Sequence, residues 1–127
     1  MAADLRYYRH ELGLTHVSSE IADWHEVNMY VYPRLAWNPD ASWRDALADF
    51  CRRGYGPAAD DMLRHWMVLE TARENWMDHR QECLGYLRQA LAKADSSEVR
   101  RRINRIAGLW QESECQHKGD HVGPCKP

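Results

Sequence analysis

Residues 30–62, YVYPRLAWNPDASWRDALADFCRRGYGPAADDM, decide the fold because two breaks separate three apolar periodic runs. The first break is Asn38-Pro39-Asp40, where proline removes a backbone donor and stops a helix. The second contains Gly54 and Gly56, which favour a helix end, and Pro57, which suits the first position of the next helix. The segment therefore predicts three successive helices joined by short turns.

The residues before this segment predict a helix, a strand and a second helix. Leu5, Tyr8 and Leu12 recur at helical spacing over residues 4–12, and Gly13 is expected to stop this helix. Residues 14–18, LTHVS, are β-branched enough to predict a short strand. Apolar positions then recur from residue 21 to residue 37, a helix that Pro33 should kink or divide.

Four further helices are predicted toward the C-terminus. Asp40 or Ser42 is expected to cap a helix that buries Trp43, Ala46, Leu47 and Phe50, with Asp45 as the partner in a capping box. Periodic apolar residues predict the others over residues 57–77, 80–94 and from Ser97 to about residue 112. The expected fold class is mainly α, with five or six helices around one core and one short N-terminal strand.

Two motifs within the opening segment resemble a known family. RLAWNPD (34–40) and FCRRGYGPAA (50–59) are similar to the C-terminal region of a domain-of-unknown-function family of glycoside-hydrolase-like barrel proteins, which is itself related to α-glucuronidases. The resemblance covers about residues 5–110. It implies that the predicted strand and its flanking helices are the last repeats of a β/α barrel.

Length and charge limit the classes of protein that the chain can represent. A closed β/α barrel needs about 250 residues, and this chain has 127, so a complete barrel is excluded. Seventeen basic and nineteen acidic side chains leave a formal charge of −2, which favours neither nucleic acid nor an anionic membrane as a partner. No signal peptide or long apolar run is visible, so the cytoplasm is the default expectation.

The candidate catalytic residue is Glu20, which follows the predicted strand. The resemblance implies that Glu20 occupies a site position of the parent barrel. The candidate substrate-binding residues are Trp24, His25, Asn28 and Tyr30, of which the aromatic Trp24 and Tyr30 are expected to face the sugar. Glycoside hydrolysis needs two carboxyl groups, however, and the upstream strands that would supply further site residues are missing here. The alternative is that Glu20 is a solvated residue at a helix N-terminus.

Tryptophans and arginines have both a structural and a functional interpretation. Five of the six tryptophans, Trp24, Trp43, Trp66, Trp76 and Trp110, fall on predicted apolar stripes, which favours core packing over sugar stacking. Trp24 is the exception to test, because it also lies next to the end of the predicted strand. Arg100, Arg101, Arg102 and Arg105 form a basic patch on the last helix. Because glutamates flank it, a solvated helix face is favoured over a nucleic-acid surface.

The C-terminal segment 114–127 is predicted to be a flexible tail after a helical domain, residues 1–113. It contains Cys115, His117, His121 and Cys125, separated by one, three and three residues. Cysteine and histidine are zinc ligands, but these gaps differ from those of a zinc knuckle. Zinc binding at the tail and a metal-free flexible tail therefore both remain open, and no other cofactor is expected.

These observations lead to two main functional hypotheses. A third, an active glycoside hydrolase, would need its second carboxylate from Asp23, Glu26 or a second subunit. In the first, the chain is a truncated or split C-terminal module of a glycoside-hydrolase-like protein, without hydrolase activity alone, that acts as a structural or binding module. In the second, it is an independent small helical interaction module, such as an inhibitor or adaptor. Both expect a protein partner or self-association, the first also allows a carbohydrate ligand, and neither involves nucleic acid or a membrane.

Overall fold

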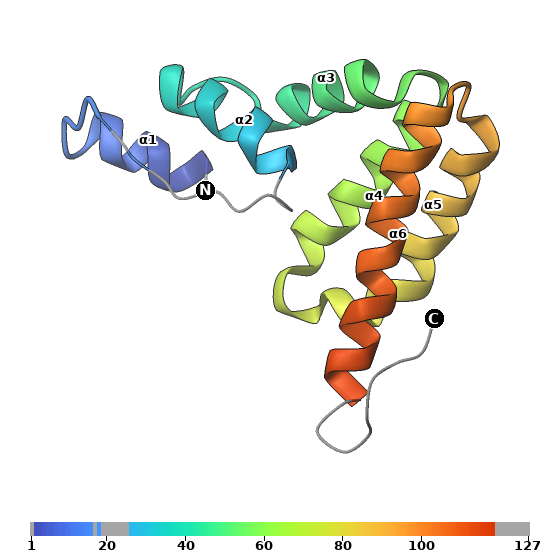
Figure 1. The fold of residues 1–127 in the computed structure, drawn as a ribbon. Coiled ribbons are helices and arrows are strands. Elements are labelled where there is room, and N and C mark those ends of the chain that lie inside the picture. The colour runs from blue at the N-terminus through green and yellow to red at the C-terminus, as the bar shows by residue number, and fades with distance from the viewer. Residues whose placement is uncertain (1, 17, 19–25, 119–127) are drawn as a thin grey trace. The chain divides into compact units, whose positions relative to one another are not determined.

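The computed structural model describes residues 2–16, 18 and 26–118, and its described part is mainly helical. The chain forms two compact units, Met1–Arg53 and Gly54–Pro127. Figure 1 shows the helices of both. The mainly α fold class is confirmed. No helix in the described part is long and apolar enough to cross a membrane.

The first unit contains α1 (Ala2–His10), α2 (Glu26–Trp37) and most of α3 (Trp43–Tyr55). Helix α1 ends as predicted, because Gly13 takes a left-handed φ of 65° and the Leu14 amide bonds to the Tyr8 carbonyl at 2.9 Å. The core of this unit is apolar and comes from all three helices: Leu5, Val31, Leu35, Ala46, Leu47 and Phe50.

The predicted strand at residues 14–18 is wrong. The described residues of this stretch, 14–16 and 18, have no strand conformation, and Leu14 is half exposed. A strand needs a neighbour to accept its backbone hydrogen bonds, and the described part of the chain contains no strand. Local β propensity was therefore an insufficient reason to expect one.

The turn between α2 and α3 follows from Asn38 and Ser42. Helix α2 continues through Pro33 to Trp37. The Asn38 side chain then accepts a hydrogen bond from the Asp40 amide at 3.2 Å, which stabilises a turn. The Ser42 hydroxyl accepts the Asp45 amide at 3.2 Å and caps α3 as predicted.

The second unit contains a helical hairpin and one further helix that packs against it. Its elements are the 3₁₀ turn η1 (Gly56–Ala58), α4 (Ala59–Ala72), the 3₁₀ segment η2 (Arg73–His79), α5 (Arg80–Lys93) and α6 (Ser97–Lys118). Helix α5 contacts both α4 and α6, as Figure 1 shows. The apolar core of this unit consists of Tyr55, Ala58, Met62, Cys83, Leu87, Ala90, Ala94, Ile103, Ile106 and Trp110.

Two helix boundaries in this unit differ from the prediction. The helix expected over residues 57–77 stops being α-helical at Ala72, and Asn75 leaves helical geometry (φ −95°, ψ 22°). The Thr71 hydroxyl bonds to the carbonyls of Met67 and Val68, a competition with the backbone that weakens a helix. At the other end, α6 continues to Lys118 and so includes part of the predicted tail.

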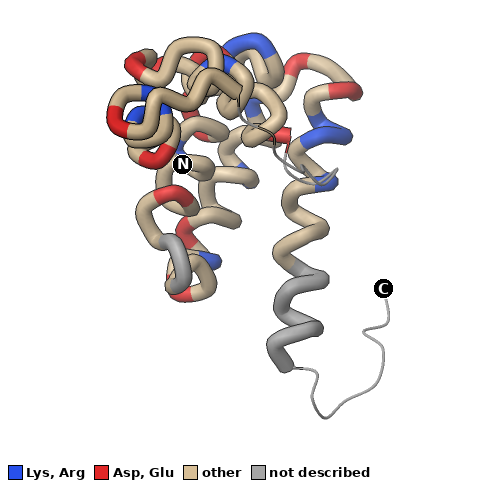
Figure 2. Tube along the Cα trace, turned by 90° about the vertical axis from the view of Figure 1, so that its left-hand side faces the viewer, with Lys and Arg blue, Asp and Glu red and all other residues tan. Residues whose placement is uncertain are grey.

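The arginines of the predicted basic patch have structural partners. Arg100 donates to the Leu91 and Ala94 carbonyls at the end of α5, at 3.2 and 2.9 Å. Arg102 donates to the Gly54 carbonyl at 3.1 Å and lies over the Tyr55 ring. These contacts fix the ends of neighbouring helices within the unit. Figure 2 shows basic and acidic positions mixed along the helices, in agreement with the balanced composition.

Candidate functional site on helices α2 and α3

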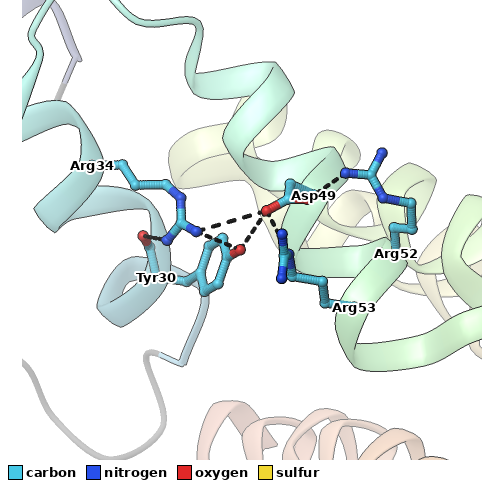
Figure 3. A network of polar contacts seen from close by, with 5 residues as sticks. All are labelled: Tyr30, Arg34, Asp49, Arg52 and Arg53. Carbon is cyan, nitrogen blue, oxygen red and sulfur yellow. Dashed lines mark hydrogen bonds and ion pairs between the residues drawn. The ribbon is translucent and has the colours of Figure 1, made fainter.

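A polar cluster in the first unit joins the two sequence motifs. Arg34 comes from RLAWNPD on α2, and Arg52 and Arg53 come from FCRRGYGPAA on α3. All three form ion pairs with one carboxylate, that of Asp49, as Figure 3 shows. Residues far apart in the sequence thus meet at a single acidic side chain.

Tyr30 connects α2 to Asp49 directly. Its hydroxyl donates to Asp49 Oδ2 at 2.5 Å, and Arg34 Nη2 donates to the same hydroxyl at 2.7 Å (Figure 3). The Arg34 guanidinium also lies 3.6 Å from the centre of the Tyr30 ring, a cation–π contact. The Tyr30 ring also packs at a tilt against the Phe50 ring, with ring centres 5.4 Å apart. Tyr30 and Arg34 are therefore held in fixed orientations.

On α3, helical spacing places Arg52 and Arg53 on the same side of the helix as Asp49. Arg53 Nε donates to Asp49 Oδ2 at 2.9 Å, four residues along the helix, and Arg52 bonds to Asp49 Oδ1 from three residues along. Both arginines lie in the last turn of α3, where a positive charge is favoured by the helix dipole. The carboxylate thus collects cations from two helices.

These contacts shift the ionisation of the cluster. The Tyr30 hydrogen bond, followed by those from Arg52 and Arg53, lowers the pKa of Asp49 to about 2, although desolvation opposes the shift. The same bond to Asp49 raises the pKa of Tyr30 above its ordinary value. The pKa of Arg53 is also raised, chiefly by its hydrogen bond to Asp49. At neutral pH the cluster therefore holds a carboxylate, a neutral phenol and three guanidinium groups.

A cavity of about 300 Å³ lies in the same unit, at the C-terminal end of α2. Its lining combines apolar side chains with a few polar ones: Leu5, Tyr8, Arg9, Thr15, Trp37 and Pro39. The side chain of Trp37 is 92% exposed. Such a mixture of aromatic, apolar and polar groups is typical of small-molecule binding sites.

Polar contacts hold α1 beside the turn that contains Pro39. Arg6 Nε donates to the Pro39 carbonyl at 2.9 Å, and His10 Nε2 lies 3.1 Å from Asp40 Oδ1. Asn38, Pro39 and Asp40 belong to the RLAWNPD motif. The motif therefore shapes one wall of the cavity and contributes Arg34 to the cluster.

Trp37, the tryptophan that lies on no predicted apolar stripe, is exposed. It is the last residue of α2, and the chain turns immediately afterwards at Asn38-Pro39. Of the five tryptophans on predicted stripes, Trp110 is buried, Trp43, Trp66 and Trp76 are half buried, and Trp24 lies outside the described residues.

Comparison with known families places this unit in a family. The family model for DUF4838, a domain of unknown function, matches residues 1–68. The chain is a member of the DUF4838 family. The match includes both motifs, the Asp49 cluster and the cavity, and ends within α4, before the predicted limit near residue 110. No curated protein and no solved structure matches the chain.

The site predicted from the DUF4838 resemblance is described only in part. Glu20, Trp24 and His25 lie outside the described residues. Asn28 and Tyr30 are both half buried in α2. The structure places Tyr30 against Asp49, and this contact was not foreseen. The spacing of Asp49, Arg52 and Arg53 at i, i+3 and i+4 was a sequence signal for half of the cluster.

The predicted zinc ligands of this DUF4838 protein are also described only in part. Cys115 and His117 lie in α6, whereas His121 and Cys125 lie outside the described residues. Within the described part of the chain, no group of three or more histidine, cysteine or acidic residues is placed to hold a metal. The zinc site stays a prediction.

The second unit contains buried polar residues that the sequence reading missed. Asp61 and His65 are both fully buried on α4. Asp61 Oδ2 lies 2.6 Å from Lys93 Nζ, while the His65 ring stands edge-on to Trp66 and Trp110. Burial lowers the pKa of His65 to about 4, and the Cys83 backbone opposes this only in part. The apolar period of α4 concealed both positions because they share the face of Met62.

Proposed function

We propose that this DUF4838 chain is the C-terminal module of a glycoside-hydrolase-like protein and acts as a carbohydrate-binding module without hydrolase activity of its own. The observation that carries the proposal is the exposed indole of Trp37 beside a cavity that also contains Tyr8 and Arg9. Sugar rings stack on exposed aromatic faces, and polar groups nearby fix their orientation.

The family match and the motif positions support this proposal. Trp37 and Pro39, which line the cavity, lie within the matched residues 1–68 and within the RLAWNPD motif. Tyr30, Arg34 and Trp37 are spaced at i, i+4 and i+7 on α2 and so share one helix face. A ligand that stacks on Trp37 would therefore lie along the face that carries the polar cluster.

A binding titration tests the carbohydrate ligand. The indole N–H signals of the ¹⁵N-labelled chain are followed by NMR while neutral xylo- and gluco-oligosaccharides are added. We expect the Trp37 signal to shift with saturation for one series, and Trp37→Ala to weaken binding about tenfold, the equivalent of about 1.4 kcal/mol. Trp43→Ala on α3 is the matched control, because Trp43 is half buried and lies outside the cavity.

Absence of hydrolysis is tested separately with a chromogenic glycuronide. A glycosidase needs a pair of carboxyl groups at a defined separation, and the resemblance supplies only Glu20. We expect no turnover above buffer by the wild type or by Glu20→Gln. Turnover by the wild type that Glu20→Gln abolishes would overturn the non-catalytic proposal.

The exposed apolar side chains of the first unit favour a second candidate, a protein-interaction module. Tyr7, Leu12, Leu14 and Met29 are each about half exposed, in addition to Trp37. Exposed apolar patches are typical of interaction surfaces. Sedimentation velocity over a concentration series distinguishes the candidates, since self-association that Leu12→Ser/Leu14→Ser removes would favour the interaction module over a monomeric carbohydrate binder.

A further inference from the structure

The Asp49 cluster has more positive charge than its carboxylate can balance. Arg34, Arg52 and Arg53 all pair with Asp49, and the Tyr30 hydroxyl donates to it and stays neutral. One negative charge therefore faces three positive charges. Arg34 alone joins α2 to Asp49 on α3, so the charges of Arg52 and Arg53, which the α3 dipole favours, exceed what this contact between the helices needs.

The arginines are accessible to a ligand. Asp49 is 20% exposed, whereas the Arg52 and Arg53 side chains are 72% and 69% exposed and Arg34 is 45% exposed. Each guanidinium has several N–H donors. Asp49 accepts hydrogen bonds from Nε of Arg53 and from one terminal nitrogen of Arg52. The other N–H groups of these two guanidinium groups are accessible to solvent or to an anion.

The positions of the arginines are fixed before a ligand arrives. Arg34 is held by the Tyr30 ring, the Tyr30 hydroxyl and the Tyr30 carbonyl. Arg52 and Arg53 are held by Asp49 on their own helix. A site whose groups are already ordered loses less conformational entropy on binding. Asp49 thus serves as an anchor for the cations around it.

We propose that Arg34, Arg52 and Arg53 form a binding site for a doubly charged tetrahedral oxyanion, the chemistry of inorganic phosphate, inorganic sulfate or a phosphate monoester. Two surplus positive charges match the two negative charges of such a group. Guanidinium groups recognise oxyanions by paired, charge-assisted hydrogen bonds. The site is independent of sugar stacking at Trp37 and holds whether or not the chain binds neutral carbohydrate.

The experiment is an NMR titration of the full ¹⁵N-labelled chain with inorganic phosphate and with inorganic sulfate at pH 7.5, with sodium chloride at equal ionic strength as the reference. We expect saturable shifts of the amide and side-chain N–H signals of Arg34, Arg52 and Arg53 with both dianions and none with chloride. Glucose 6-phosphate then shows whether the dianionic group binds when a small molecule carries it, and glucose 6-sulfate, a monoanion of similar shape, should bind more weakly.

Two arginine variants on α3 distinguish specific anion binding at the cluster from a general effect of the charge of the chain. Arg53→Gln should weaken binding of both dianions about tenfold, because it removes a charge-assisted contact. Arg44→Gln removes an equal charge from α3 at a residue that lies over Trp43 instead, and should leave binding unchanged. Arg52→Gln repeats the test if Arg53→Gln fails to fold.

Two outcomes would overturn the proposal. One is a shift that chloride reproduces at equal ionic strength, which would mean screening of ion pairs. The other is equal weakening by Arg53→Gln and Arg44→Gln, which would mean attraction to the general charge of the chain. Loss of sugar binding in Trp37→Ala with phosphate binding intact would support the independence of the two sites.

Discussion

Asp49 remains ionised in acid because Tyr30, Arg52 and Arg53 donate hydrogen bonds to it. Its pKa is lowered from 3.8 to about 2, and the hydrogen bond from Tyr30 is the largest cause. The folded pKa lies below the unfolded value, so the cluster stabilises the chain above about pH 3.8 and loses that contribution as the pH falls toward 2.

Tyr30→Phe should raise the pKa of Asp49, because it removes the strongest donor to the carboxylate. Titration of the carboxyl ¹³C signal measures the change directly. Tyr32→Phe on the same helix is the control and should leave the Asp49 titration where it is in the wild type. An unchanged Asp49 pKa in Tyr30→Phe would show that the arginines alone account for the shift.

His65 is a second residue whose ionisation affects the free energy of unfolding. Unlike Asp49, which is paired with cations, His65 is buried among apolar side chains. It is fully buried, and neither ring nitrogen has a hydrogen bond of normal geometry within the described residues. Its pKa falls from 6.5 to about 4. The unfolded chain therefore binds more protons between these values, and stability declines as the pH falls from 6.5 to 4.

His65→Leu should flatten this pH dependence. Protonation at His65 changes the free energy of unfolding by about 1.4 kcal/mol per pH unit, or about 3 kcal/mol across the window. Urea unfolding at a series of pH values measures the slope. His79→Gln is the control, since His79 is 44% exposed and pairs with Glu82 on the surface. A slope equally reduced in both variants would contradict the assignment to His65.

At the scale of the element, two glycines should respond oppositely to alanine. Gly56 has a φ of 51°, which a residue with a Cβ adopts at a cost, whereas Gly85 lies inside α5 with nothing within 4 Å of an added Cβ. Gly56→Ala should destabilise the chain by about 1 kcal/mol, and Gly85→Ala should stabilise it by about 1 kcal/mol. Urea midpoints compare the two, and changes of the same sign would contradict the prediction.

Helices with strong signals at both ends were the most predictable elements. Ser42 and Gly56 bracket α3, and the residues around Ser96 separate α5 from α6, with Ser96 accepting the Val99 amide at 3.2 Å. The strand at 14–18 and the long helix to residue 77 failed for different reasons. The strand would have needed a neighbouring strand to pair with. The long helix ends early because the Thr71 hydroxyl bonds to backbone carbonyls and Asn75 leaves helical geometry.

The candidate site was less predictable than the helices. Tyr30 was expected near a ligand, but its bond to Asp49 depends on how α2 packs on α3, and periodicity does not specify packing between helices. Trp37 lies on no predicted apolar stripe, and periodicity alone does not show that its exposed indole borders a cavity.

In the molecule as a whole, the C-terminal segment carries the predicted zinc ligands. Cys115 and His117 lie within the bounds of α6, and His121 and Cys125 lie outside the described residues. If these four residues ligate one zinc ion, we expect one metal per chain in native mass spectrometry.

Cys115→Ser and Cys125→Ser should each abolish a zinc response at this segment. Cys51→Ser is the control, because burial raises the pKa of Cys51 to about 12 and keeps it a protonated thiol that ligates metal poorly. A zinc stoichiometry of one that survives both tail variants would contradict the four-ligand site. A chain that takes up no zinc would leave this segment without a metal role.

The contacts of Arg100 have a consequence for how the chain folds. Its guanidinium bonds to carbonyls only nine and six residues earlier, so the end of α5 and the start of α6 stabilise each other through neighbouring parts of the sequence. Contacts of this kind close short loops and form early in folding. We therefore expect the contact between the end of α5 and the start of α6 to form early in the folding of the second unit.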